Sequence, residues 1–390
     1  MTFIQGFQSL YLHIPFCKTK CTYCAFNAYA NMDTLVNDFV DALVREVEIV
    51  GRSRPGQQLH TIYFGGGTPS LLSPGQFERL LSTIHALFNV KSGSEISLEA
   101  NPNDLDAPYL TALRQLGFNR LSIGMQSAHQ NELRLFARRH DNDAVARAVS
   151  AARRAGFANL NLDLIYGFPH QTMTTWKASL VQMMALQPDH VSLYALGVEE
   201  GTPLERWIAR GELPEPDDDL AADMYDLATD ILGQGGFEQY EISNWAKPGY
   251  ECRHNLQYWR NLPYPGVGPG AHGWAGGVRY STILAPQKYI QALKSSVGDY
   301  VYPRTPATVE ALEVDRPGEI VDTLLMGLRL TREGIQRAAF RERFGEDVVT
   351  LYPALMNRFS AQGLLRIDAD TVRLTTEGRL LSNMIFRELV

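Results

Sequence analysis

Hydrophobic and polar residues alternate along residues 8–14, the first clearly patterned stretch of the chain. Leu10, Leu12 and Ile14 face one way, and Tyr11 and His13 face the other, which is the period-2 pattern of a β-strand. Further predicted strands span residues 61–64, 95–99, 120–126, 159–166 and 190–197. Helical patterns between them span about residues 33–50, 74–88, 106–117 and 171–186, with one more that ends near residue 155.

Six strand–helix units in succession predict a parallel sheet, because a parallel strand can be reached only through a crossover connection. Right-handed crossovers curl such a sheet into a full or partial (β/α) barrel. The fold class expected from the pattern alone is therefore α/β. No sequence repeat accompanies this structural repeat.

The inner faces of these predicted strands are polar. In the strand over residues 159–166, the leucines at 160, 162 and 164 alternate with Asn159, Asn161 and Asp163. The strands over residues 95–99 and 120–126 alternate in the same way. A carboxylate facing a dry interior would be too costly, so this face should line a cavity that holds a ligand or water. The alternative is a sheet with one face open to solvent.

The pattern changes after the last predicted strand. Residues 262–273 are dense in turn residues and predict an ordered loop over the barrel mouth. A less periodic stretch over residues 303–317 suggests a boundary, so we expect a barrel domain over residues 1–310 and a second domain over residues 311–390. Helical patterns at 320–330, 335–344 and 352–362, a hairpin at 364–374 and a final helix ending near residue 389 resemble a winged helix.

The charge of the chain argues against nucleic-acid binding. The net charge is −7 and the pI is about 5.8, whereas a general nucleic-acid binder needs a basic surface. In the expected C-terminal domain Arg337, Arg341 and Arg343 are offset by nearby acidic residues. This domain is therefore expected to cover a substrate or bind a protein partner. A DNA-binding regulator is the weaker alternative.

The composition indicates a protein of the cytoplasm. The 390 residues are 45% hydrophobic and 20% charged, as in ordinary globular proteins. The first seven residues lack the basic and apolar regions of a signal peptide. No apolar run approaches the roughly 18 residues that a membrane span needs. Transient association with a membrane is compatible with this composition.

Three of the four cysteines, Cys17, Cys21 and Cys24, fall within eight residues. An odd count in a cytoplasmic chain argues against disulfides, and the paired spacing of a zinc site is absent. Three thiolates around a [4Fe–4S] cluster leave one iron free to bind another molecule. Buried structural cysteines are the plain alternative. The C-x3-C-x2-C spacing resembles the radical S-adenosylmethionine (SAM) superfamily, in which the amino and carboxylate groups of SAM chelate the open iron.

The predicted cysteine loop is one of four features at the carboxyl ends of the predicted strands. The loop Gly65-Gly66-Gly67-Thr68 follows the second strand, Glu99 ends the third and Gln126 ends the fourth. Active sites of barrels lie at this end. Without Cβ atoms the glycines allow close backbone approach, so their amides and the Thr68 hydroxyl could bind a ligand; a simple tight turn is the alternative.

Four segments together resemble one family within that superfamily, the oxygen-independent coproporphyrinogen III dehydrogenases and the related HemW-like heme chaperones. These segments are residues 11–17, the Gly-Gly-Gly-Thr-Pro loop, residues 99–102 and residues 161–167. The resemblance implies a radical SAM partial (β/α)6 TIM-type barrel with a small C-terminal winged-helix-like domain. It also implies that Cys17, Cys21 and Cys24 ligate a [4Fe–4S] cluster. The positions that it assigns to SAM are Tyr11, Gly66, Gly67, Thr68, Glu99, Gln126, Arg138 and Asp163, with Arg139 as the neighbouring candidate for Arg138.

Two departures separate the chain from the dehydrogenases of this family. The dehydrogenases have a fourth cysteine where this chain has Phe26, and a long extension where only sixteen residues precede Cys17. The chain does carry His254-Asn255-Leu256-Gln257-Tyr258-Trp259, which matches a motif associated with heme in the HemW-like proteins. His254 is thus the candidate heme ligand, with a hydrogen-bonded structural histidine as the alternative; Cys252 could be a second ligand or simply buried.

The function that follows from the resemblance is that of a heme chaperone carrying a [4Fe–4S] cluster and SAM and delivering heme to an acceptor protein. The alternative is an enzyme, oxygen-independent coproporphyrinogen III dehydrogenase, which would form protoporphyrinogen IX by radical chemistry. The sequence does not decide whether SAM is cleaved. It also leaves open the acceptor, the second axial ligand of the heme and the oligomeric state.

Overall fold

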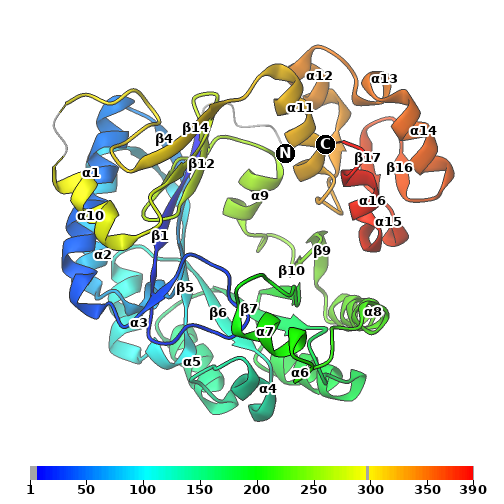
Figure 1. The fold of residues 1–390 in the computed structure, drawn as a ribbon, viewed down its shortest axis with the longest axis horizontal. Helices are drawn as coiled ribbons and strands as arrows, with labels where there is room; N and C mark the ends of the chain where they lie inside the picture. The colour runs from blue at the N-terminus through cyan, green and yellow to red at the C-terminus, as the bar shows by residue number, and fades with distance from the viewer. Residues whose placement is uncertain (1–6, 296–297, 390) are drawn as a thin grey trace.

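The computed structural model describes residues 7–295 and 298–389 (Figure 1). The expectation that the N-terminus lacks a signal peptide concerns residues 1–6, which lie outside the described residues, and Phe7. In the described part of the chain, no helix is both long enough and apolar enough to cross a membrane.

A nine-stranded sheet forms the centre of the larger part of the chain, in the order β11-β1-β4-β5-β6-β7-β8-β10-β9. The strands from β11 to β8 are parallel to their neighbours, and β10 and β9 continue the sheet antiparallel. The two edge strands, β11 and β9, do not pair with each other, so the sheet is not closed into a full barrel. The predicted partial barrel is confirmed. The six predicted strands are β1 (Phe7–Ile14), β4 (Gln58–Gly66), β5 (Asn89–Ala100), β6 (Arg120–Gln126), β7 (Asn159–Tyr166) and β8 (His190–Ala195). The added strands are β9 (Glu238–Glu241), β10 (Asn244–Ala246) and β11 (Gly266–Val267).

Helices cover the outer face of the sheet and bury its aliphatic side chains (Figure 1). The helices between the strands are α1 (Val36–Ser53), α2 (Pro74–Leu87), α3 (Ala107–Gln115), α4 (Gln130–Leu135), α5 (Asn142–Arg154) and α6 (Met173–Ala185). They are followed by α7 (Pro203–Ala209), α8 (Asp218–Gln234), α9 (Arg253–Trp259) and α10 (Pro286–Lys294). Short 3-10 helices span Asp33–Leu35, Pro69–Leu71 and Pro102–Asp104. The predicted helix that ends near residue 155 is two helices, because the chain turns between α4 and α5.

The predicted alternation of polar and apolar faces is confirmed. Leu160, Leu162 and Leu164 are fully buried in the core beneath the helices. Asn161 and Asp163, on the opposite face of the same strand, line an internal cavity. The barrel lumen is therefore polar, as a curled sheet with one ligand-facing side requires.

The expectation of a loop over the barrel mouth is wrong for residues 262–273. This stretch contains β11, which pairs with β1 at the edge of the sheet, with Gly266 opposite Tyr11 and Val267 opposite Leu12. It then enters β12 (His272–Ala275), the first strand of a three-stranded antiparallel sheet with β13 (Val278–Thr282) and β14 (Thr308–Glu313). Because β1 presents a free edge, the backbone of this stretch satisfies its hydrogen bonds there.

The C-terminal residues bury a second hydrophobic cluster, from Ile320 to Leu389. Its helices are α11 (Arg316–Gly327), α12 (Arg337–Phe344), α13 (Val348–Leu351), α14 (Pro353–Ala361), α15 (Thr376–Leu380) and α16 (Ser382–Phe386). A small sheet has the order β15 (Ile335–Gln336), β17 (Thr371–Leu374), β16 (Leu365–Ile367). The helix, hairpin and helix pattern agrees with the winged-helix-like expectation; the domain boundary at residues 310 and 311 stays a prediction.

The arginines of α12 are used within the protein. Arg337 and Arg341 both pair with Asp347, and Arg343 pairs with Glu319 and donates to the Asn261 carbonyl oxygen. These contacts attach the C-terminal helices to each other and to the segment after α9. They leave these guanidinium groups engaged rather than displayed for a phosphate backbone.

Candidate functional site

The three clustered cysteines lie at one cavity. β1 leads into the two-residue strand β2 (Phe16–Cys17), which pairs with β3 (Tyr29–Ala30). Cys17 ends β2, and the loop between β2 and β3 carries Cys21 and Cys24. Cys17, Cys21 and Cys24 are all partly exposed and line a cavity of about 490 Å³. Cys252, the fourth cysteine, is fully buried and does not line this cavity.

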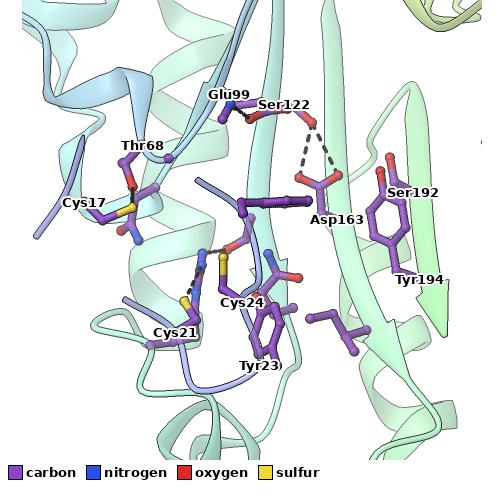
Figure 2. A pocket seen from close by; sticks show the side chains of 18 of the residues that line it. Cys17, Cys21, Tyr23, Cys24, Thr68, Glu99, Ser122, Asp163, Ser192 and Tyr194 are labelled. Atoms are coloured by element: carbon purple, nitrogen blue, oxygen red, sulfur yellow. Dashed lines mark hydrogen bonds between the residues drawn. The ribbon is translucent and has the colours of Figure 1, made fainter. Parts of the chain in front are cut away.

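Two side chains from outside the loop donate to the sulfurs (Figure 2). The Thr68 hydroxyl lies 3.3 Å from Cys17 Sγ, and Arg138 Nη1 lies 3.6 Å from Cys21 Sγ. Burial raises the pKa of the Cys17 thiol, and the Thr68 hydrogen bond partly opposes this rise. Hydrogen bonds and a guanidinium charge both favour thiolates, which are the form that binds iron.

The donor set fits an iron–sulfur cluster with three protein ligands. Three thiols on one loop face a shared cavity, and no fourth cysteine lies at that cavity. Three cysteines leave one iron of a [4Fe–4S] cluster without a protein ligand. Within residues 7–295 and 298–389, no three His, Cys, Asp or Glu side chains are grouped as a ready site for one metal ion. The fit therefore rests on the donor chemistry and on the common cavity.

The glycine loop supports the cysteine loop more than it offers free amides. The amide of Gly67 donates to the Ile14 carbonyl oxygen and that of Thr68 to the Phe16 carbonyl oxygen, both at 2.8 Å. The Gly66 amide donates to Glu99 Oε2 at 3.0 Å. The Thr68 hydroxyl likewise donates to Cys17 Sγ. Ligand binding by these groups stays a prediction, and in this structure each of them has an internal acceptor.

Glycine is nevertheless required at this loop. A Cβ atom on Gly67 would lie 2.7 Å from the Phe16 carbonyl oxygen and 2.9 Å from that of Ile14, and neither backbone atom can move without moving the cysteine loop. Gly66 has a φ of +111°, which a side chain disfavours. Gly66, Gly67 and Thr68 all line the cavity.

Two carboxyl groups face the cavity from neighbouring strands. Glu99 accepts the Tyr63 hydroxyl at 2.9 Å as well as the Gly66 amide. Burial raises the pKa of Glu99 to about 7, and the charge of Asp163 adds to the rise. Burial also raises the pKa of Asp163, against hydrogen bonds from Asn161 and Ser122; the Ser122 bonds are drawn in Figure 2. Both carboxyls can accept hydrogen bonds from ligand hydroxyl or ammonium groups.

Gln126 and Arg138 also line the cavity. Gln126 ends β6 with a φ of +65°, which is rare outside glycine and often marks a functional position. Arg138 Nη2 donates to the Gly124 carbonyl oxygen at 2.9 Å. The adjoining Arg139 pairs with Asp104 instead. Of the two candidate arginines, Arg138 is therefore the one that contacts a cluster cysteine.

Tyr11 and His254 do not line the cavity. The Tyr11 hydroxyl lies 3.0 Å from His13 Nδ1, and its ring lies against Tyr63. His254 is fully buried in α9. Its Nδ1 lies 2.7 Å from the Thr61 hydroxyl, and its Nε2 lies 2.8 Å from the Tyr258 hydroxyl. Both ring nitrogens are occupied, so neither is available to heme iron in this conformation.

Helix α9, which carries the heme-associated motif, closes the amino-terminal end of the barrel lumen. The His254 ring stacks on Tyr63 with 4.9 Å between centroids. The buried Glu95 carboxylate accepts the amides of Arg253 and His254 at 3.0 and 3.1 Å, which caps the positive end of the helix. Figure 1 shows α9 in the middle of the molecule, between the strands and the C-terminal helices.

The sequence analysis missed several polar residues of the cavity. The unpredicted lining residues include Tyr63, Arg120, Ser192, Tyr194 and Asn255. Strand parity could have found Arg120, because it shares the polar face of β6 with Ser122 and Gln126. Asn255 belongs to the His254–Trp259 motif, but only the packing of α9 against the barrel brings it to the cavity.

The open barrel, with three cysteines after its first strand, defines a radical SAM protein. Residues 11–181 match the radical SAM superfamily model, and residues 314–381 match the HemN C-terminal domain. Among solved structures, coproporphyrinogen III oxidase (HemN) from Escherichia coli superposes with a TM-score of 0.83, covering 98% of this chain and 90% of that one. The identity is 23%, so this likeness establishes the fold.

Curated relatives are similar over nearly the whole chain. The heme chaperone HemW of Bacillus subtilis is 36% identical over 97% of this chain and 98% of its own length. That of Mycobacterium tuberculosis is 39% identical, covering 98% and 94%. The mitochondrial radical S-adenosyl methionine domain-containing protein 1 of Mus musculus is 34% identical, covering 95% and 84%. The chain belongs to the HemW family, and the predicted family resemblance is confirmed.

Proposed function

We propose that this protein is a heme chaperone that binds heme and transfers it to an acceptor protein. The observation that carries the proposal is the similarity to proteins named heme chaperone HemW over nearly the full length of both chains. Phe26 adds support, because this exposed side chain stands where the dehydrogenases of the wider family carry a cysteine. We keep a cytoplasmic location as a prediction, and the acceptor is unidentified.

We assign the cavity to a [4Fe–4S] cluster and SAM. Cys17, Cys21 and Cys24 would hold the cluster, with Thr68 and Arg138 donating to two of the sulfurs. When bound, such a cluster can supply an electron to SAM. Among the cavity residues named for SAM, the Glu99 and Asp163 carboxyls would accept hydrogen bonds from its polar groups. Gly66, Gly67, Gln126 and Arg138 would form the wall against which SAM rests.

Heme ligation by His254 requires α9 to move. The bonds to Thr61 and Tyr258 must break before either imidazole nitrogen can reach iron. Cys252 is equally enclosed, since its thiol is buried and directed at Glu95. We retain His254 as the candidate ligand in a conformation in which α9 has moved away from β4 and the imidazole is exposed.

The alternative function is coproporphyrinogen III dehydrogenase. The observation that favours it is the cavity itself, in which the cysteines and the positions assigned to SAM are brought together. Radical chemistry on a substrate would use the same residues. A chaperone and an enzyme differ in what they do with a tetrapyrrole, so turnover distinguishes them.

The test uses anaerobically reconstituted full-length protein. We expect added hemin to bind at stoichiometric levels with a shifted Soret band. With SAM, a reductant and coproporphyrinogen we expect no protoporphyrinogen. Turnover of coproporphyrinogen without stoichiometric heme binding would overturn the chaperone assignment and support the dehydrogenase.

A further inference from the structure

The floor of the cavity is a layer of side chains from adjacent strands. Strand pairing sets Tyr63 opposite Ser97 and Ser97 opposite Arg120, so these residues lie at one level. Glu99 and Ser122, two residues further along β5 and β6, form the next level. Arg120 is therefore deeper in the lumen than every carboxyl and thiol assigned above, yet it lines the same cavity.

Arg120 is buried (2% exposed), and one donor atom of its guanidinium, Nε, has no hydrogen-bond partner among the described residues. The hydroxyl of Ser97, at the same level, also has none there. A buried guanidinium without a hydrogen-bonded anion is costly. A buried guanidinium donor that lacks a partner and lies beside a cavity favours a ligand that supplies the missing acceptor.

The nearby acidic groups do not supply the missing partner. Burial lowers the pKa of Arg120, but neighbouring groups, Cys252 and Glu95 first among them, raise it above its ordinary value. Glu95 gives Arg120 no hydrogen bond, because its two oxygens accept the backbone amides of Arg253 and His254. Glu99 and Asp163 also sense the charge of Arg120. Both carboxyls are already hydrogen-bonded: Glu99 accepts the Tyr63 hydroxyl and the Gly66 amide, and Asp163 accepts Asn161 and Ser122.

We propose that the Arg120 guanidinium binds a carboxylate group of an organic ligand that occupies the floor of the cavity. A guanidinium presents two parallel N–H donors to the two oxygens of a carboxylate. Ser97 lies at the same level but does not line the cavity, so the guanidinium is the donor that faces the ligand. Because Glu99 and Asp163 lie above, the carboxylate end of the ligand would point down to Arg120, and its hydroxyl or cationic groups would lie at the carboxyls.

The carboxylate of SAM is expected at the open iron of the cluster, so two further kinds of ligand carry this chemistry: a tetrapyrrole with propionate side chains and a small free carboxylic acid. The first arm of the test titrates wild-type protein and Arg120→Gln with hemin and with hemin dimethyl ester, which lacks free carboxylates. The second arm measures the thermal stabilisation of both proteins by propionate and by succinate. Arg79→Gln is the matched control, since Arg79 is paired with Asp41 and does not line the cavity.

A tetrapyrrole at the floor predicts that Arg120→Gln weakens hemin binding at least about tenfold, the loss of a charge-assisted hydrogen bond, and leaves the diester unchanged. A free acid predicts stabilisation of the wild type by propionate or succinate that Arg120→Gln abolishes. Arg79→Gln should behave as wild type in both arms. If Arg120→Gln does not fold, Arg120→Lys keeps the charge without the paired donors and should show the same losses in smaller degree.

The proposal is overturned if neither arm distinguishes the Arg120 variants from wild type. Arg120 would then serve only as a charge that offsets Glu99 and Asp163. The result is separate from the chaperone assignment: if wild-type protein does not bind hemin, that assignment fails, and the second arm still decides the role of Arg120.

Discussion

The Nδ1 atom of His254 lies 2.7 Å from the hydroxyl oxygen of Thr61, across the interface between α9 and β4. Burial holds the pKa of this imidazole well below its ordinary value, so the ring is neutral. A neutral ring has one donor and one acceptor nitrogen, and the hydroxyls of Thr61 and Tyr258 occupy both. The histidine expected to bind heme is, in this conformation, part of the packing that closes the barrel.

His254→Ala should therefore have two effects. Loss of a buried ring and its hydrogen bonds should lower the free energy of unfolding by roughly 2–4 kcal/mol. Hemin binding should weaken or its Soret band should change, because an imidazole ligand is lost. Chemical denaturation and hemin titration measure the two effects.

Thr61→Val is the control for His254→Ala, since it removes the hydrogen bonds of the Thr61 hydroxyl to His254 and Ser9 and keeps the imidazole. We expect it to leave the Soret band of bound heme in place. If it changes the spectrum as much as His254→Ala does, the loss at His254 comes from the altered position of α9, and His254 is not the iron ligand.

The cysteine loop makes a prediction about iron. Alanine at Cys17, Cys21 or Cys24 should abolish an oxygen-sensitive [4Fe–4S] centre, because each removes one of three protein ligands. Cys252→Ala should retain it, since that thiol is buried away from the cavity. Iron and sulfide analysis with EPR, in the presence and absence of SAM, measures this; a zinc-filled tetrathiolate site would contradict it.

Gly67→Ala should lose the cluster although it removes no ligand. Its Cβ would meet the carbonyl oxygens of Phe16 and Ile14 at 2.7 and 2.9 Å, which displaces the strand that carries Cys17. Gly75→Ala is the matched control, because no atom lies within 4 Å of its added Cβ. Cluster content after reconstitution decides: equal content in both variants would show that the close approach at Gly67 does not position the cysteine loop.

Alanine at Glu99 or at Asp163 should weaken SAM binding without removing iron. Loss of a hydrogen bond to a charged group costs roughly 1.5–3 kcal/mol, or about one to two decades in affinity. Equilibrium binding of SAM to the reconstituted variants, with iron content measured in parallel, is the test. Unchanged affinity in both variants would mean that the cavity holds another ligand at these carboxyls.

Glu99 should also affect how stability depends on pH. Burial raises its pKa to about 7 in the folded protein, above its value in the unfolded chain, which is about 4.3. The folded state then binds more protons than the unfolded state between these values, so Glu99 makes stability fall as pH rises through this window. Above about pH 7 the penalty is complete.

Glu99→Gln should remove this contribution, so its free energy of unfolding should depend less on pH between about 4.3 and 7. The measurement is denaturant unfolding of the apoprotein across this range, compared with wild type. Glu200→Gln, at an exposed position, is the control and should follow wild type. A Glu99→Gln profile parallel to that of wild type would contradict the raised pKa.

Much of the fold was predictable because local pattern sets it. Alternation in β6 and β7 identified both the strands and their polar face, since period 2 places every second side chain in the lumen. The stretch over residues 262–273 was not predictable in the same way. Its turn residues indicate a loop, but pairing with the free edge of β1 makes part of it a strand, and a partner distant in sequence leaves no local signal.

The sequence by itself determined the chemistry at the carboxyl end of the barrel. The spacing of Cys17, Cys21 and Cys24 and the strand ends at Glu99 and Gln126 depend on short segments of chain, and parallel strands necessarily bring such ends together. Only the tertiary structure showed which residues lie at the amino-terminal end of the barrel lumen. The burial of His254 follows from α9 folding back beneath β4 and β5, a contact between segments more than 150 residues apart. The burial of Arg120, whose Nε has no hydrogen-bond partner among the described residues, is likewise visible only in the folded structure.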